Sequence, residues 1–217
     1  MATLPVSSIM RRIRNVVRHG LILQSLSDAL GKAGLELSMY NLYRDGPYED
    51  GFRPSMPKLD EFETMFFGPE EFAQIGRVPG ERDSEQYLLG MHGEGKRCFG
   101  LKTRDEVVSY IWCETRAFNY LGHDIPLETG EAYMFGTYTL RKWRGRNALA
   151  VMRYDFTKEL VAEGNTQFRS VISRFNTPAI HLKEKLTPYQ YEQYLHVALF
   201  GVWRKRWLVG RGEGGGT

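Results

Sequence analysis

The chain has 217 residues, of which 42% are hydrophobic and 25% charged, and its formal net charge at pH 7 is +3. This composition is ordinary for a folded globular protein and argues against a disordered chain. The small net charge argues against a polycation that coats nucleic acid. The length suits one substantial domain or two small ones.

Cysteine content and hydropathy indicate the compartment. The two cysteines, Cys98 and Cys113, are too few for a disulfide scaffold and lack the spacing of metal ligands. We expect both to be small strand residues in a reducing environment. No apolar run reaches the roughly 20 residues of a membrane-spanning helix, and arginines interrupt the first apolar run too early for a signal peptide. The sequence therefore predicts a cytoplasmic protein.

Residues 1–34 are predicted to be a separate amphipathic segment. Met10, Ile13 and Val17 recur at helical spacing, and arginines occupy the other faces of the same stretch. Two interpretations stay open. The helix either packs on the domain with a solvated basic side, or it contacts an anionic membrane surface.

Strand and helix patterns alternate through the rest of the chain. Strands are predicted at 35–44, 59–67, 97–102, 107–114, 132–140 and 168–173, with a last strand from 191 running into a basic aromatic tail, and helices at 69–75, 84–91, 148–164 and 177–186. Thr103 to Glu106 reads as a hairpin turn, and the stretches 45–57 and 115–131 read as loops.

This order predicts one α/β or α+β domain over residues 35–209. We expect a mixed β-sheet of about six or seven strands flanked by helices, antiparallel early in the chain and with a β-α-β crossover late. The glycine-rich residues 210–217 are expected to be a flexible tail.

The stretch Leu140–Ala150 (LRKWRGRNALA) is a cationic turn between a long predicted strand and an amphipathic helix. The first N–H groups of a helix have no internal partners and carry the positive end of its dipole, so a pyrophosphate can dock there. Neither GxxxxGK[ST] nor GxGxxG is present. A nucleic-acid patch is not favoured, because the arginines occupy one tight turn and not a spaced helical stripe.

The run TLRKWRGRNAL, followed by an amphipathic helix, a strand and NTPAIHLKEKL, resembles the acyl-CoA-binding half of the GNAT superfamily of N-acetyltransferases. The resemblance covers residues 96–186. It implies a GNAT-like fold, acetyl-CoA or another acyl-CoA as co-substrate, and no metal. It further implies direct attack of an amine on the thioester, with no covalent enzyme intermediate.

The resemblance assigns a cofactor site residue by residue. Arg144 matches the leading arginine of the family's pyrophosphate loop, and the strand backbone at Tyr138 to Leu140 matches the segment that pairs with the pantetheine arm. The full set of matching positions is Tyr138, Thr139, Leu140, Arg144, Gly145, Arg146, Asn147, Ala148, Leu149 and Asn176.

Four features depart from the family pattern, one of them Thr187-Pro188 in place of the usual Gly-Phe. Asn147 replaces a glycine, and asparagine is the best non-glycine residue for a left-handed backbone. Leu149 replaces a glycine or alanine, and its bulk could alter or block the cofactor site. Lys183 stands where the family has the tyrosine that protonates the departing thiolate.

Several residues are candidates for proton transfer. Lys183 could donate a proton, although a lysine on a helix is usually solvated, and Tyr189, Tyr191 or Tyr194 could serve instead. His181, two residues before Lys183, is on a different helix face and is expected to be structural or exposed. Candidate bases for the acceptor amine are Glu114, Glu131, His123 and Asp124.

Three functions stay open on the sequence alone. The first is transfer of acetyl from acetyl-CoA to a small primary amine or an amino sugar, with peripheral contact of the inner membrane face through the N-terminal arginines and Trp203–Trp207 (WRKRW). The second is transfer of a longer acyl chain from CoA or an acyl carrier protein. The third is a binding module that kept the fold and lost catalysis. A nucleic-acid partner is not expected.

Overall fold

The computed structural model describes residues 34–48, 54–55, 61–80 and 82–215. The predicted N-terminal helices lie outside these residues. The chain divides into two compact units, which we call the central unit (Arg44–Ser170) and the terminal unit (Met1–Tyr43 with Val171–Thr217). No helix in the described ranges combines the length and apolar character needed to cross a bilayer.

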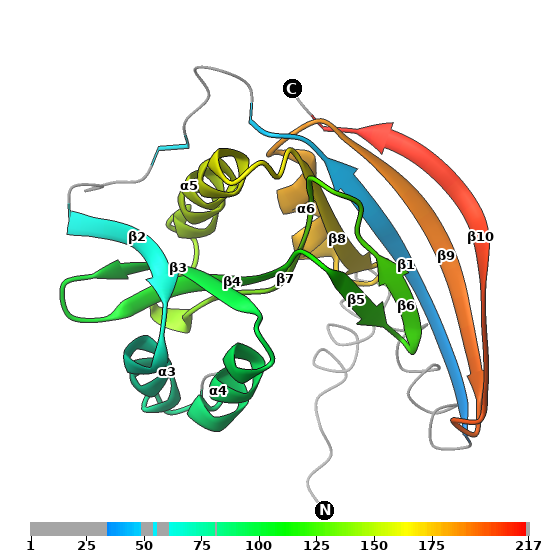
Figure 1. The fold of residues 1–217 in the computed structure, drawn as a ribbon, viewed down its shortest axis with the longest axis horizontal. Helices are drawn as coiled ribbons and strands as arrows, with labels where there is room; N and C mark the ends of the chain where they lie inside the picture. Colours follow the sequence, from blue (N-terminus) through cyan, green and yellow to red (C-terminus); the bar gives the residue numbers. More distant parts are fainter. Residues whose placement is uncertain (1–33, 49–53, 56–60, 81, 216–217) are drawn as a thin grey trace, which may run out of the picture. The chain divides into compact units, whose positions relative to one another are not determined.

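The central unit is a sheet covered on both faces (Figure 1). Its elements are β2 (Phe62–Phe67), α3 (Pro69–Gly76), α4 (Glu85–Gly93), β3 (Arg97–Thr103), β4 (Val107–Glu114), β5 (Ala117–Tyr120), β6 (His123–Pro126), β7 (Glu131–Thr139), a short 3-10 helix (Arg141–Trp143), α5 (Ala148–Ala162) and the first half of β8 (Gln167–Ser173). The strands lie in the order β8-β7-β4-β3-β2. Neighbours are antiparallel except β7 and β8, which are parallel and joined through α5, so the predicted late crossover is confirmed.

Strand alternation separates two hydrophobic cores in this unit. Ile111 of β4 belongs to the cluster formed with α5, which includes Phe156. Its neighbours Tyr110 and Trp112 point to the other face, where they pack with Phe72 of α3 and further residues of α3 and α4. The sheet is therefore held between α5 on one face and α3 and α4 on the other. The mixed α+β class is confirmed.

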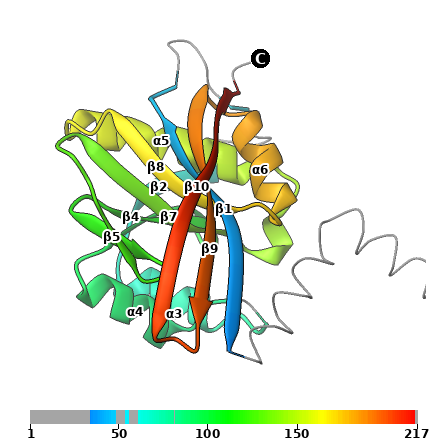
Figure 2. The ribbon, with the colours of Figure 1, turned by 90° about the vertical axis from the view of Figure 1, so that its right-hand side faces the viewer.

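The terminal unit contains most of β1 (Leu35–Asp45), the end of β8, α6 (Thr177–Glu184), β9 (Tyr189–Leu199) and β10 (Trp203–Gly214). The strands lie in the order β10-β9-β1-β8, and β9 and β10 form a long antiparallel hairpin (Figure 2). The buried rings of Tyr40 and Tyr43 on β1 contact rings of β9. Tyrosine packing thus joins β1 to the hairpin.

The structure corrects two sequence predictions. Residues 115–131 do not form only a loop, because β5 and β6 pair as a separate hairpin inside this stretch. The last predicted strand is a β9–β10 hairpin, and β10 continues through Arg211–Gly214, which the glycine content had assigned to a tail. The other predicted strands and helices in the described ranges are found with ends shifted by a few residues. Cys98 and Cys113 are free and buried in strands, as expected.

Candidate functional site

The strand β7 carries a bulge that shapes its outer edge. Pairing with β8 covers Glu131 to Tyr133 only. The pairing with β4 shifts where Tyr110 faces Tyr138 but Trp112 faces Phe135, so an extra residue of β7 is accommodated. Gly136 lies there with φ +61°, and a Cβ added to it would lie 3.0 Å from the Trp112 ring. The bulge bends the strand and redirects its backbone groups.

The loop from β7 to α5 presents a row of backbone donors. Gly145 and Asn147 both have positive φ, +76° and +63°, which confirms the left-handed conformation expected for Asn147. The N–H groups of Ala150 and Val151 donate to the carbonyl of Asn147. Within the described ranges, the five successive N–H groups from Gly145 to Leu149 have no acceptor. Such a row at the positive end of a helix dipole suits an anion.

The side chain of Asn147 holds the loop from outside. Its Nδ2 donates to the carbonyl oxygen of Ser55 at 2.8 Å. The Asn147 side chain therefore does not cap α5, and it leaves the first N–H groups of the helix available as donors.

Two arginines of the loop are held by aromatic rings. The Nε of Arg144 donates to the carbonyl oxygen of Thr139 at 3.1 Å, and its guanidinium carbon lies 5.2 Å from the centre of the Tyr138 ring. The guanidinium carbon of Arg146 lies 4.9 Å from the centre of the Trp143 ring. Cation–π contacts of this kind restrict the arginine side chains while leaving their charge exposed.

Two further residues of the loop, Lys142 and Leu149, make contacts with the rest of the central unit. Lys142 is paired with Glu106, with Nζ 2.6 Å from Oε1, so it contributes less positive potential than the sequence predicts. Leu149 is half-buried and packs against the hydrophobic cluster under α5. Part of its bulk is therefore taken up by the core, and its effect on a cofactor stays a prediction.

The sequence did not identify an arginine that reaches the bulge from the segment before α4. Arg82 donates from Nη2 to the carbonyl oxygen of Gly136 at 3.0 Å, and its guanidinium carbon lies 4.6 Å from the Tyr138 ring centre. Asp83 forms an ion pair with Arg82 and accepts a hydrogen bond from Tyr110 at 2.6 Å. A glycine inside a strand pattern signals a bulge, so Gly136 was the available clue.

The candidate base Glu131 stands at the start of β7 and is 3% exposed. It accepts hydrogen bonds from Arg169 at 2.7 and 3.0 Å and from the N–H of Glu128 at 3.1 Å. Burial favours a higher pKa for Glu131, but these hydrogen bonds and the charges of Arg169 and Arg44 outweigh it, and the pKa is lowered. A carboxylate with these partners is well suited to joining β7 to β8.

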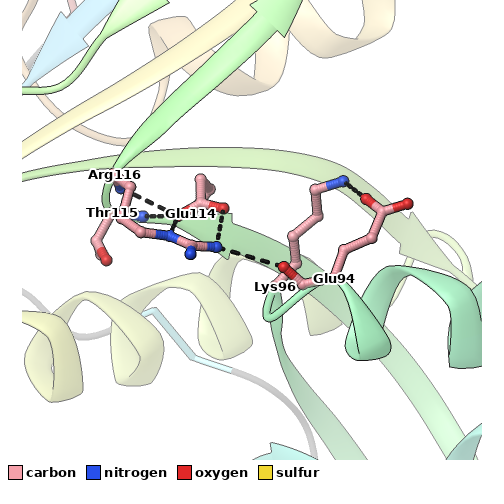
Figure 3. Close-up of polar contacts among 5 residues, drawn as sticks. All are labelled: Glu94, Lys96, Glu114, Thr115 and Arg116. Carbon is pink, nitrogen blue, oxygen red and sulfur yellow. Dashed lines mark hydrogen bonds and ion pairs between the residues drawn. The ribbon is translucent and has the colours of Figure 1, made fainter.

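Glu114 at the end of β4 has a similar set of contacts (Figure 3). Its Oε1 accepts from the N–H groups of Thr115 and Arg116, and the Arg116 guanidinium binds both carboxylate oxygens. The same guanidinium donates to the carbonyl oxygen of Glu94, whose carboxylate pairs with Lys96. Burial favours a raised pKa for Glu114, but the bonds from Arg116 and Thr115 outweigh it, and the pKa is lowered. The catalytic roles of Glu114 and Glu131 stay predictions.

Two further candidate bases lie on β6. His123 faces Tyr120 across the β5–β6 hairpin, and Asp124 accepts a hydrogen bond from Asn119 at 2.7 Å. The contact of Asp124 serves the hairpin itself.

The remaining predicted residues belong to the terminal unit. Lys183 is 2% exposed, and its Nζ lies 5.5 Å from the centre of the Tyr43 ring, so the expectation of a solvated helix lysine is wrong. Tyr189 packs edge-on against Tyr43, and its pKa is raised by burial first and by the neighbouring Tyr43 second. Asn176 caps α6 by accepting from the N–H of Ala179, and His181 is exposed.

The comparisons with known proteins identify a fold. No protein-family model and no curated protein matches the chain. Among solved structures, it is similar to a tandem GNAT protein from the clavulanic acid biosynthesis pathway, with a TM-score of 0.50 and 11% identity over 83% of this chain and 55% of that one. It is also similar to a putative GNAT acetyltransferase from Novosphingobium aromaticivorans, with a TM-score of 0.47 and 14% identity over 76% of this chain and 68% of the other.

A third similar structure is the ribosomal-protein-S18-alanine N-acetyltransferase of Escherichia coli, with a TM-score of 0.42 and 15% identity over 58% of this chain and 80% of that one. The chain spans little more than half the length of some of these neighbours, namely 55% of the tandem protein and 58% of a Drosophila protein.

Proposed function

We propose that this chain, which has the fold of the GNAT acetyltransferases, is an acyl-CoA-dependent N-acyltransferase that moves an acetyl group from acetyl-CoA to a primary amine. One observation carries the proposal: five successive backbone N–H groups, from Gly145 to Leu149, have no acceptor in the described ranges and point from the first turn of α5 and the loop before it.

The donors of this loop match the charge of a pyrophosphate. Gly145 and Asn147 have left-handed conformations of the kind found in backbone nests, in which successive N–H groups bind an anion. Arg144 and Arg146, held by their aromatic rings, add positive potential without a change in side-chain conformation on binding. The geometry fits a CoA pyrophosphate.

The edge of β7 suits the pantetheine arm. The arm carries two amides, which pair with free strand backbone as an added strand would. In the proposal the segment Tyr138 to Leu140 makes these bonds, and the thioester then lies nearer the bulge at Gly136, where an N–H can polarise the carbonyl oxygen.

Chemistry follows from placing the amine beside the thioester. The amine nitrogen attacks the carbonyl carbon, the C–S bond breaks, one proton leaves the nitrogen, and one proton is taken up by the thiolate. The family resemblance assigns the last proton to Lys183, with Tyr189 as the alternative, and both roles stay predictions. Lys183→Met is then expected to lower kcat and leave the Kd for acetyl-CoA within about threefold of wild type.

Neither Glu114 nor Glu131 is the favoured base, because arginines and backbone N–H groups already occupy their oxygens. An amine that arrives unprotonated, or one that loses its proton to water, is compatible with these contacts. Glu131→Gln and Glu114→Gln test this point, since each is expected to change stability more than kcat.

We propose a small amine or an amino sugar as the acceptor. We also propose a cytoplasmic location. Acyl transfer is tested by mixing the protein with acetyl-CoA and a panel of primary amines and measuring release of free CoA thiol. Both protein thiols are buried, so the signal reports CoA. We expect amine-dependent release that falls at least tenfold in Arg144→Glu, by the loss of one charge-assisted contact of about 1.5–3 kcal/mol.

The same assay separates the alternatives. Faster release from a long-chain acyl-CoA, or only from an acyl carrier protein, would change the donor. Binding of acetyl-CoA without release for any amine would favour a module that has lost catalysis.

A further inference from the structure

The tip of the β9–β10 hairpin exposes large apolar side chains to solvent. Phe200 is 76% exposed and Val202 is 89% exposed in the loop between the strands, and Trp203 at the start of β10 is 45% exposed. The hairpin with its tip runs along the terminal unit in Figure 2. Apolar residues gathered at one exposed tip indicate an interaction surface more strongly than scattered ones do.

The conformation of Phe200 is unusual as well as its exposure. Its φ is +49°, a left-handed conformation that bulky residues rarely adopt. Its N–H donates to the carbonyl oxygen of Gly34, and its ring lies against Gly34, where a Cβ would come within 2.3 Å of Cδ1. Glycine or asparagine would suit this backbone better. Backbone conformations of this kind are frequent at functional sites.

The charged residues that follow the tip along β10 are basic as far as Gly212, whereas the exposed Glu36 of the neighbouring strand β1 lies near His196 of β9. Arg204, Lys205 and Arg206 follow Trp203 directly, while Arg211 further along β10 is paired with Glu192 of β9. No aspartate or glutamate occurs between Glu192 and Glu213. An apolar tip followed by a cationic stretch is complementary to an anionic surface with an apolar interior.

Aromatic and basic side chains alternate along one side of β10. Trp203 and Trp207 lie with ring centres 6.3 Å apart, and the Nζ of Lys205 lies 5.3 Å from the Trp207 ring centre. Both tryptophans remain more than a third exposed. Tryptophan prefers the boundary between water and lipid, because its ring is apolar and its N–H is polar.

Other occupants fit this surface less well. A second copy pairing along β10 would bring two cationic stretches together, and like charges facing each other are unfavourable. A nucleic acid would match the charge but not the protruding Phe200 and Val202.

We propose that the β9–β10 hairpin docks on an anionic membrane surface, with Phe200 and Val202 inserted at the boundary of headgroups and acyl chains and with Arg204 and Lys205 against the headgroups. This inference does not depend on the proposed acyltransferase activity. It places the protein at the membrane whatever reaction it performs.

The test is flotation of the full chain with vesicles of phosphatidylcholine, pure or mixed with phosphatidylglycerol. We expect binding only to the mixed vesicles, with a partition coefficient that falls as salt is raised. The tip variant Phe200→Asn/Val202→Ser is expected to lower the partition at least about tenfold. The charge variant Arg204→Gln/Lys205→Gln is expected to lower it about tenfold or more.

Matched controls come from the segment after α3. Val78→Ser removes a 39%-exposed apolar side chain and Arg77→Gln removes an exposed cation, and both are expected to leave partitioning unchanged. Asparagine tolerates the left-handed backbone at Phe200, so the tip variant should unfold at a temperature no lower than wild type.

The proposal is overturned if wild type fails to float with the mixed vesicles, or if the tip variant floats as well as wild type. It is also overturned if light scattering shows a dimer of the free chain that the tip variant converts to a monomer. Failure of acetyl-CoA binding would leave these outcomes unaffected and would count against the acyltransferase proposal alone.

Discussion

The left-handed backbone of Asn147 gives the sharpest prediction for the loop. Replacing it with valine, Asn147→Val, places a β-branched residue at φ +63°, which costs about 1–2 kcal/mol. For a chain of this size each kcal/mol corresponds to roughly 2–4 °C in Tm, so we expect Tm to fall by about 2–8 °C. The backbone can relieve the strain only by turning its N–H groups.

That rearrangement should weaken binding of acetyl-CoA. Loss of one hydrogen bond to a charged group removes about 1.5–3 kcal/mol, which is roughly a tenfold to hundredfold rise in Kd. Isothermal titration with acetyl-CoA measures it, alongside thermal unfolding.

The matched control is Asn147→Gly, which removes the hydrogen bond to Ser55 but keeps the left-handed conformation accessible. We expect its Kd to stay within about threefold of wild type. The reasoning is refuted if both variants weaken binding equally, because the amide contact and not the backbone would then hold the loop. It is also refuted if Asn147→Val binds as wild type.

Three further outcomes follow from the central unit. Asp45→Ala should lower the free energy of unfolding by about 3–5 kcal/mol in urea titrations, because Arg153 is left as a buried charge without its 2.6 Å partner. If this cause is right, the double variant Asp45→Leu/Arg153→Met should lose less free energy of unfolding than Asp45→Ala, and an equal loss would contradict it. Burial raises the pKa of the Cys98 thiol well above its usual value, so alkylation at pH 8 should be slow in the native protein and fast in denaturant. Folding lowers the pKa of Glu131, so the stabilisation from its carboxylate is present above the unfolded pKa of about 4.3 and is lost as pH falls through the folded value. The difference in free energy of unfolding between wild type and Glu131→Gln should therefore become smaller below pH 4. A difference that stays constant down to pH 2 would contradict this reasoning.

Regular patterns made most of the fold predictable. The β3–β4 hairpin was readable because two β-rich runs flank a polar tetrapeptide, and α5 because its apolar residues share one helical face. The turn before α5 was predictable because a cationic, glycine-containing stretch separates a strand pattern from a helix pattern. Asn147 adopts the conformation that its residue type predicted.

The two missed hairpins have turns that only half match the usual residue preferences. In the β5–β6 turn Leu121 adopts φ +52°, and in the β9–β10 turn Phe200 adopts φ +49°, positions where asparagine, aspartate or glycine is expected. The glycines at the end of β10 also gave this segment the composition of a flexible linker. The local trace of each turn is the single glycine that follows, Gly122 or Gly201, which also has a positive φ.

Long-range contacts were also beyond the sequence. Arg82 reaches Gly136 across 54 positions, and nothing in its own neighbourhood marks that partner. The burial of Lys183 beside the Tyr43 ring of β1 likewise does not follow from its place on a short helix. Partner choice depends on tertiary packing, which local patterns do not encode.

The central claim is that the β7–α5 loop binds the pyrophosphate of an acyl-CoA. Isothermal titration of the wild-type chain with acetyl-CoA, compared with Arg144→Glu and Asn147→Asp, tests it most directly. We predict saturable binding by wild type and a Kd at least about tenfold higher in both variants, since each places a negative charge beside the phosphates. An affinity that ignores both substitutions, or no binding at millimolar acetyl-CoA, would contradict the account.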